Sequence, residues 1–196
     1  MGATRPTTRW KTCPTGKWNA CPAGDGYNHI IVKKSGISAQ RLHFTRRHLP
    51  HFQIGGSWYF ITFRSKTGIL PAEARTLAAQ AIIFANGKKY ALSTATVMPD
   101  HVHILLNPAE KENGIFYPLG QITKSIKGYS ARTINKLSGS SGAVWQRESF
   151  DRIVRNEDEW REKYEYIRNN AVKAGLCEKP EDYPWLLDGD DFIKRW

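Results

Sequence analysis

The 196-residue sequence has few cysteines and no long apolar segment. Its three cysteines, Cys13, Cys21 and Cys177, are an odd and sparse set, which argues against the disulfide framework of a small secreted protein. No apolar run is long enough to span a bilayer, and the N-terminus lacks the apolar region of a secretory signal. We therefore expect a cytoplasmic protein without a membrane partner.

Acidic residues are scarce in the first 50 residues, which hold nine Lys or Arg and one Asp. The rest of the chain holds 20 Lys or Arg against 17 acids, so most of the formal net charge of +11 lies in this leader. Excess positive charge favours a polyanionic partner, because neutralising phosphates releases counterions. The leader is rich in Thr, Gly and Pro and has no apolar periodicity. We expect a basic, partly irregular N-terminal extension at residues 1–45, one domain at residues 46–187 and a C-terminal tail at residues 188–196.

Apolar periodicity and turn signals divide the predicted domain into strands and helices. The strands are predicted at residues 57–64, 89–98, 101–106 and 150–155, and the helices at residues 71–85, 116–137 and 157–170. Pro99-Asp100 reads as a tight turn between two strands, which indicates an antiparallel hairpin. The order strand, helix, strand, strand, helix, strand, helix predicts an α+β fold. A ferredoxin-like (RRM-like) core, with helices packed on an antiparallel β-sheet, fits this order.

Two histidines, His101 and His103, stand two residues apart in the strand that follows this turn. Residues i and i+2 of a strand point to the same face, so both imidazoles project together while Val102 and Ile104 face a core. Two imidazoles on a rigid strand are the start of a divalent-metal site. They do not complete one, and a purely structural role for the pair is the alternative.

The last predicted helix carries two tyrosines that helical geometry separates. Trp160, Tyr164 and Ile167 recur at i, i+4 and i+7 and form an apolar stripe. Tyr166 lies about 200° further round the helix than Tyr164 and shares a face with Asn170. A tyrosine oxygen can attack a phosphodiester and form a covalent phosphotyrosine, while a divalent cation offsets the charge that builds on the phosphate. Packing is the alternative role for Tyr166, and the sequence alone does not bring the strand and the helix together.

Four ordered blocks resemble one family of transposases over roughly residues 46–187. Pro99-Asp100-His101-Val102-His103 resembles the HUH motif of single-tyrosine transposases. Three further blocks resemble motifs of REP-associated tyrosine transposases (RAYTs): Gly56-Ser57-Trp58-Tyr59, the segment that starts at Val144-Trp145-Gln146, and the block from Tyr166 to Gly175. Asp100 and Ala171 depart from the family pattern, which usually has Asn and Pro at these positions.

The resemblance implies a metal-dependent single-stranded DNA endonuclease and strand transferase. It would act at hairpin (REP-like) sequences through a covalent 5′-phosphotyrosine intermediate. By this analogy Tyr166 is the nucleophile, and His101, His103 and Asn170 hold Mg²⁺ or Mn²⁺. The resemblance also implies a ferredoxin-like core, and it places the protein in the cytoplasm, associated with the nucleoid. It leaves open whether the protein is a monomer or a homodimer, and whether the tyrosine acts in its own chain or in a second one.

We expect DNA contacts from basic and aromatic side chains around these blocks. The predicted DNA-binding residues are Trp58, Lys124, Lys127, Arg132, Arg147, Arg152 and Arg155. The basic residues can contact phosphates, and an aromatic ring can stack on an unpaired base. Burial in the core is the alternative for Trp58, and a solvated helix face is the alternative for the lysines.

Two other functions fit the same residues. A metal phosphohydrolase would use the histidine pair without a covalent step, and its turnover would survive the loss of Tyr166. A catalytically silent, transposase-derived DNA-binding protein would bind hairpin DNA without cleaving it.

Overall fold

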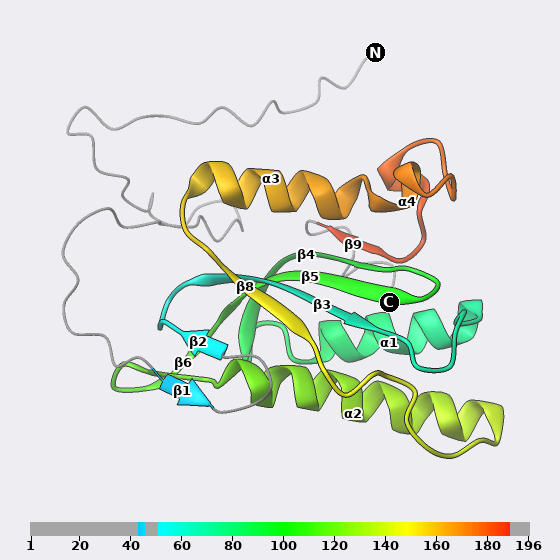
Figure 1. Ribbon diagram of the computed structural model, residues 1–196, viewed down its shortest axis with the longest axis horizontal. Coiled ribbons are helices and arrows are strands. Elements are labelled where there is room, and N and C mark those ends of the chain that lie inside the picture. Colours follow the sequence, from blue (N-terminus) through cyan, green and yellow to red (C-terminus); the bar gives the residue numbers. More distant parts are fainter. Residues whose placement is uncertain (1–42, 46–50, 189–196) are drawn as a thin grey trace, which may run out of the picture. The chain divides into compact units, whose positions relative to one another are not determined.

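The computed structural model describes residues 43–45 and 51–188 (Figure 1). Two compact units, Met1–Ala39 and Gln40–Trp196, divide the chain, and all the described residues belong to the second unit. Cys13, Cys21, nearly all of the predicted basic extension and the tail after Asp188 lie outside the described residues. The domain boundaries proposed from the sequence therefore stay a prediction.

A five-stranded antiparallel sheet forms the centre of the described unit. In spatial order its strands are β8 (Phe150–Val154), β3 (Trp58–Arg64), β5 (His101–Pro108), β4 (Tyr90–Val97) and β9 (Leu186–Asp188). The first four strands, together with helices α1 (Ala72–Phe84) and α2 (Leu119–Ser138), have the connectivity of a ferredoxin-like core. The predicted α+β class is confirmed, and β9 extends the sheet beyond β4.

Helices cover both faces of this sheet (Figure 1). Helices α1 and α2 pack on one face, where Tyr59, Ile61 and Phe63 of β3 join their apolar residues in the main core. Helix α1 buries mostly alanines, whose small side chains let the helix approach the sheet closely. Helix α3 (Glu157–Arg168) lies across the other face. Because strand residues alternate, this face receives Trp58, Phe60 and Thr62 of β3.

The connection between β5 and α2 is not irregular throughout. It contains a small hairpin of β6 (Glu110–Glu112) and β7 (Ile115–Phe116), so α2 starts three residues later than predicted. The turn of this hairpin has positive φ at both Asn113 and Gly114. A side chain at Gly55 is excluded, since a Cβ there would lie 2.4 Å from the Phe116 ring. Strands β1 (His43–Thr45) and β2 (His51–Gln53) form another two-stranded sheet.

The predicted last helix is two helices in the structure. Asn156 caps the start of α3, because its side chain accepts a hydrogen bond from the Glu159 N–H at 2.8 Å. The helix ends at Arg168, and the side-chain amide of Asn169 donates to the Glu165 carbonyl at this break. A short helix, α4 (Asn170–Lys173), follows.

The segment after α4 packs back on the domain through Tyr183 and Trp185. It passes through a 3₁₀ turn, η1 (Pro180–Asp182), before β9. The Tyr183 hydroxyl donates to the Val97 carbonyl at 2.9 Å, and the Trp185 indole N–H donates to Thr76 Oγ1 at 3.1 Å. None of the described helices is long and apolar enough to cross a membrane.

Candidate active site

His101 and His103 lie side by side on the face of β5 that α3 covers. Their ring centroids are 4.6 Å apart. The intervening Val102 and the following Ile104 are fully buried in the core on the other face. Strand alternation thus separates the two imidazoles from the core, as the sequence predicts.

Each histidine is held at Nδ1 by an oxygen of its own chain. The Nδ1 of His101 lies 2.6 Å from Asp100 Oδ1, and the Nδ1 of His103 lies 2.7 Å from Thr62 Oγ1. Thr62 faces His103 because the two residues are cross-strand partners in the β3–β5 register. When each Nδ1 carries the proton and donates it to these oxygens, Nε2 keeps its lone pair. Histidines that bind metals in proteins are usually oriented in this way.

The electrostatics keep His103 neutral. Burial lowers the pKa of His103 to about 3, and the neighbouring His101 and Arg64 act in the same direction. Burial works to raise the pKa of Asp100, but the hydrogen bond from His101 and the charges of His101 and Arg64 outweigh it, so this pKa lies below its usual value. At neutral pH the site therefore combines an ionised Asp100 with an imidazole that has a free lone pair.

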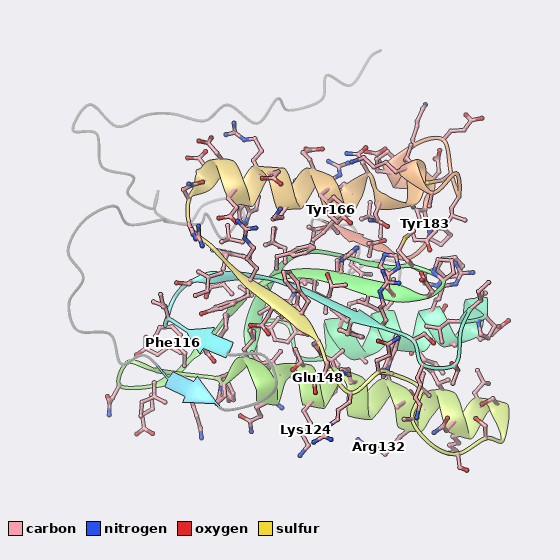
Figure 2. The ribbon with its side chains drawn as sticks, in the orientation of Figure 1. Phe116, Lys124, Arg132, Glu148, Tyr166 and Tyr183 are labelled. Carbon is pink, nitrogen blue, oxygen red and sulfur yellow. The ribbon has the colours of Figure 1, made fainter. Side chains whose placement is uncertain are left out.

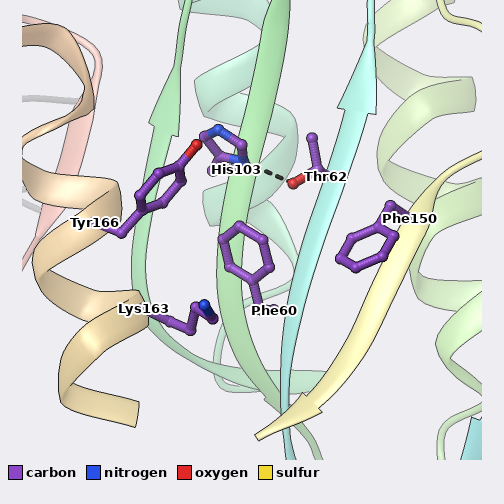
Figure 3. Close-up of a pocket in the computed structure, with 6 residues that line it drawn as sticks. All are labelled: Phe60, Thr62, His103, Phe150, Lys163 and Tyr166. Carbon is purple, nitrogen blue, oxygen red and sulfur yellow. Dashed lines mark hydrogen bonds between the residues drawn. The ribbon is translucent and has the colours of Figure 1, made fainter. Parts of the chain in front are cut away.

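Tyr166 lies over His103, with the two ring centroids 5.2 Å apart. Its hydroxyl points toward the His103 ring (Figure 3), and 39% of the residue is exposed. The predicted helix phase holds, because Ile167 is fully buried while Tyr164 turns away and donates to Asp188 Oδ1 at 2.8 Å. The fold thus brings together the strand and the helix that the sequence could not connect.

A pocket of about 240 Å³ opens between α3 and β8 at this point (Figure 3). Six residues line it: Phe60, Thr62, His103, Phe150, Lys163 and Tyr166. The Phe60 ring stacks on His103 at 5.3 Å and meets Tyr166 and Phe150 edge-on. Thr62, Phe60 and Phe150 are absent from the residues predicted from the sequence. Only the register of β3 against β5 and β8 identifies them, and no local sequence pattern encodes that register.

Asn170, the predicted third metal ligand, begins α4 one helical turn after Tyr166 and is half-buried. Its neighbour Ala171 packs with Met98, which directly precedes the turn into His101. The start of α4 therefore lies close to the histidine end of β5. Within residues 43–45 and 51–188, no three His, Cys, Asp or Glu side chains cluster as a metal site. A cation at the histidine pair would thus need an amide, phosphate or water oxygen to complete its shell, and metal ligation by Asn170 remains a proposal.

Two of the predicted DNA-binding residues have structural contacts instead. Trp58 is only 7% exposed, and its ring meets that of Trp160 on α3 edge-on at 6.3 Å. This burial favours the core alternative for Trp58 and leaves no open ring face for a base. Lys127 donates to the Arg147 carbonyl at 3.0 Å and to Ser149 Oγ at 3.1 Å. It therefore anchors the loop before β8, and a phosphate contact of Lys127 stays a prediction.

The other predicted DNA-binding residues are exposed but do not share one surface. Arg152 lies beside the pocket, because it pairs with Phe60 across the β3–β8 ladder, and its Nε is 2.7 Å from Glu159 Oε1. Lys124 and Arg132 lie on α2, on the opposite side of the sheet from Tyr166 (Figure 2). Arg147 and Arg155 are exposed at the two ends of the β8 segment.

The Trp-Gln block fixes the connection from α2 to β8. Trp145 is buried edge-on against Phe63 at 4.9 Å, and its indole N–H donates to Ser130 Oγ on α2 at 2.9 Å. The backbone N–H of Gln146 donates to the Arg64 carbonyl at 2.9 Å. These contacts place β8, and with it Phe150, at the edge of the sheet.

Comparison with known proteins finds similar transposases. A curated protein of Haemophilus influenzae, named as a REP-associated tyrosine transposase, is 27% identical over 94 residues, which are 45% of this chain and 53% of that protein. The chain thus spans about half the length of this relative. The REP-associated tyrosine transposase of Escherichia coli K12 is 23% identical over 133 residues, 67% of this chain and 75% of the relative.

A solved structure has the same fold. It is described as a REP-associated tyrosine transposase bound to a REP hairpin, and it matches with a TM-score of 0.58 at 20% identity over 72% of this chain and 82% of its own. The resemblance to these transposases that the sequence motifs indicate is thereby confirmed. The family model described as "Transposase IS200 like" matches residues 65–170, more than half of the sequence. The chain therefore belongs to the IS200-like transposase family.

Proposed function

We propose that this protein is a metal-dependent single-stranded DNA endonuclease and strand transferase that acts at hairpin (REP-like) sequences. The observation that carries the proposal is the edge-on contact of Tyr166 with His103, whose ring lies next to that of His101, within one chain. A phenol oxygen next to two oriented imidazoles is the donor set that tyrosine-mediated phosphoryl transfer requires.

In the proposed reaction, Tyr166 Oη attacks the phosphorus of a single-stranded phosphodiester. A bond forms between Oη and phosphorus, and the bond from phosphorus to the 3′ oxygen of the preceding nucleotide breaks. Tyr166 loses its proton, and the departing 3′ oxygen gains one, so a free 3′-OH and a 5′-phosphotyrosine result. The covalent intermediate conserves the energy of the phosphodiester, which lets another 3′-OH attack later and restore a DNA strand.

His101, His103 and Asn170 are the residues that would hold Mg²⁺ or Mn²⁺. The histidine pair fits such an ion, because both Nδ1 atoms are anchored and His103 is neutral. When bound, the cation would offset the negative charge that builds on the phosphate oxygens. Asp100 and Thr62 orient the two rings, and Phe60 fills the space beneath them.

Hairpin DNA is the proposed partner because the relatives and the fold neighbour are named for REP sequences. Arg152 lies beside the pocket and the exposed Arg155 directly follows β8, and both are proposed phosphate contacts. The exposed Lys124, Arg132 and Arg147 would contribute to hairpin binding outside the pocket. The protein would act on DNA in the cytoplasm as a monomer or a homodimer.

A covalent-adduct assay tests this function. A labelled hairpin oligonucleotide with single-stranded flanks, incubated with the protein and Mn²⁺, should give a protein–DNA adduct that survives denaturing electrophoresis. Mass spectrometry should locate the DNA on Tyr166. The Tyr166→Phe variant should bind the hairpin but form no adduct, whereas Tyr164→Phe, two residues away on the same helix, should still form it.

Two results would contradict the proposal. An adduct formed by Tyr166→Phe would exclude Tyr166 as the nucleophile. Hairpin binding without cleavage under any divalent metal would instead support a silent, transposase-derived DNA-binding protein.

A further inference from the structure

Phe150 is an exposed aromatic residue beside the reaction centre that the cleavage chemistry does not use. It is 53% exposed and forms the β8 wall of the pocket that also contains His103 and Tyr166 (Figure 3). Strand β8 is an edge strand, and its alternation sends Phe150 to the same face of the sheet as Phe60. A large apolar ring is thus kept partly in solvent within the site itself.

We propose that this pocket binds one unpaired nucleobase next to the scissile phosphate, with Phe150 as its stacking platform. The inference rests on the proposed function, since it assigns a base-binding subsite to the same site.

The contacts of Phe150 favour stacking. Its ring meets Phe60 at a centroid distance of 6.5 Å and an interplanar angle of 69°. Phe60 is itself fixed between His103 and Tyr166 by ring contacts of 5.3 and 5.9 Å. An edge-on contact with a buried ring steadies Phe150 and leaves much of its surface open. Such a ring can stack on any base, because every base has a π-face.

The size and polarity of the pocket match a single base. Its volume of about 240 Å³ lies below the range of about 300–1,000 Å³ for drug-sized ligands. It suits one heterocycle and is too small for a base pair. Lys163 lies on the opposite wall, with its ammonium 5.8 Å from the Phe60 ring centroid. Since an ammonium only donates hydrogen bonds, Lys163 would pair with a carbonyl or ring nitrogen of the base.

The same pocket explains why the base would adjoin the cleaved bond. Tyr166 is one of its lining residues, so a phosphate at the Tyr166 hydroxyl would adjoin the pocket. The base attached to that phosphate through one sugar needs only to turn into the space between α3 and β8. Binding of this base in the pocket would fix the position of the phosphodiester relative to Tyr166.

Fluorescence provides a test that needs no cleavage. In Tyr166→Phe protein, 2-aminopurine is moved one position at a time along the single-stranded flank of a hairpin oligonucleotide. We expect strong quenching at one position beside the cleavage point, lost when Phe150→Ala is added and kept with Phe150→Trp. Phe84→Ala is the matched control, because Phe84 is a 67% exposed phenylalanine on α1 outside the pocket.

Cleavage provides the second readout. In the otherwise unaltered protein, an abasic site at the quenched position should slow adduct formation about 5- to 150-fold, the range for one stacked base. Phe150→Ala should slow it to a similar extent. The two changes together should add little beyond either alone, while melting temperature stays unchanged.

The outcomes separate this inference from the proposed function. If Phe150→Ala forms adducts at the normal rate, the base subsite is wrong. It is also wrong if the effects of Phe150→Ala and of an abasic site multiply at every position. Neither result would contradict the proposed nuclease function. Absence of any adduct together with Phe150-dependent quenching would support the base subsite and contradict the nuclease. Quenching that is equal in Phe150→Ala and Phe84→Ala would also overturn the subsite.

Discussion

At the scale of single residues, Thr62 controls how His103 is presented. Its hydroxyl lies 2.7 Å from His103 Nδ1 on the sheet face that α3 covers, where no second described side chain bonds to that nitrogen. Valine has nearly the same shape as threonine but cannot make this hydrogen bond. The Thr62→Val variant should therefore keep its fold and bind Mn²⁺ about 10- to 100-fold more weakly, as expected when a partner of a histidine ligand is lost.

Calorimetry with Mn²⁺ alone measures this effect without DNA. Thr133→Val is the matched control, because the Thr133 hydroxyl bonds only to carbonyls of its own helix. Equal Mn²⁺ affinity in both variants would show that His103 does not hold the ion.

The Tyr59 hydroxyl stabilises the turn at Gly55 and Gly56. Its buried hydroxyl accepts a hydrogen bond from the Ile54 N–H at 2.7 Å and donates one to the Ile54 carbonyl at 3.1 Å. Tyr59→Phe should lower the free energy of unfolding by about 1 kcal/mol at pH 8, because the Ile54 N–H loses its acceptor. The variant should otherwise retain the fold, since the ring still fills the core.

The same residue predicts a pH dependence. Burial raises the pKa of Tyr59 from 10.0 to about 12, although the hydrogen bond with Ile54 opposes this rise. Between pH 10 and 12 the unfolded chain loses this proton while the folded chain keeps it, so stability falls as pH rises. Phenylalanine has no such proton, so the stability gap between the parent protein and Tyr59→Phe should narrow from pH 10 to pH 11. Urea denaturation at both pH values measures it, and a constant gap would contradict the assignment.

At the scale of elements, an aromatic cluster packs against α3, the helix that carries Tyr166. Trp58 of β3 meets Trp160 of α3, which stacks on Tyr164 at 5.0 Å. Trp58→Ala should cost about 3–5 kcal/mol of stability, as for other buried tryptophans, and should loosen α3. We expect faster hydrogen exchange in α3 and slower adduct formation, both largely restored in Trp58→Phe. If Trp58 instead stacked on DNA, the alanine variant would lose DNA affinity at normal stability.

The residue periodicity within single helices and strands was sufficient to predict much of this architecture. The separation of Tyr166 from Tyr164 and the common face of His101 and His103 both follow from helix and strand geometry. What periodicity could not predict depends on contacts between elements. The β3–β5 register pairs Thr62 with His103, packing buries Trp58 under α3, and the Lys127 ammonium bonds to the loop before β8. Periodicity does not predict the break of α3 at Asn169. This break involves a local hydrogen bond from the Asn169 side chain to the Glu165 carbonyl.

At the scale of the whole molecule, the site is assembled from one chain. Tyr166 contacts His103 of its own chain, and Tyr164 and Arg168 tie the same helix to Asp188 of β9. A mixture of the two inactive variants His103→Ala and Tyr166→Phe should therefore form no adduct. Recovery of adduct in the mixture would show that chains exchange their tyrosine helices. The parent protein, diluted to the same total concentration, is the control.

Because α2 and α3 lie on opposite faces of the central sheet, the protein can be attached to a surface through the side that carries α2. The exposed Ser-Gly loop at residues 138–142 leaves the end of α2, on the side of the sheet opposite α3 (Figure 1). Loop tips of small polar residues tolerate insertions well. A short peptide tag inserted between Ser140 and Ser141 would let single molecules be immobilised through the α2 side. The face that carries Tyr166 would then be open to the solution, and the proposed cleavage could be tested on single molecules.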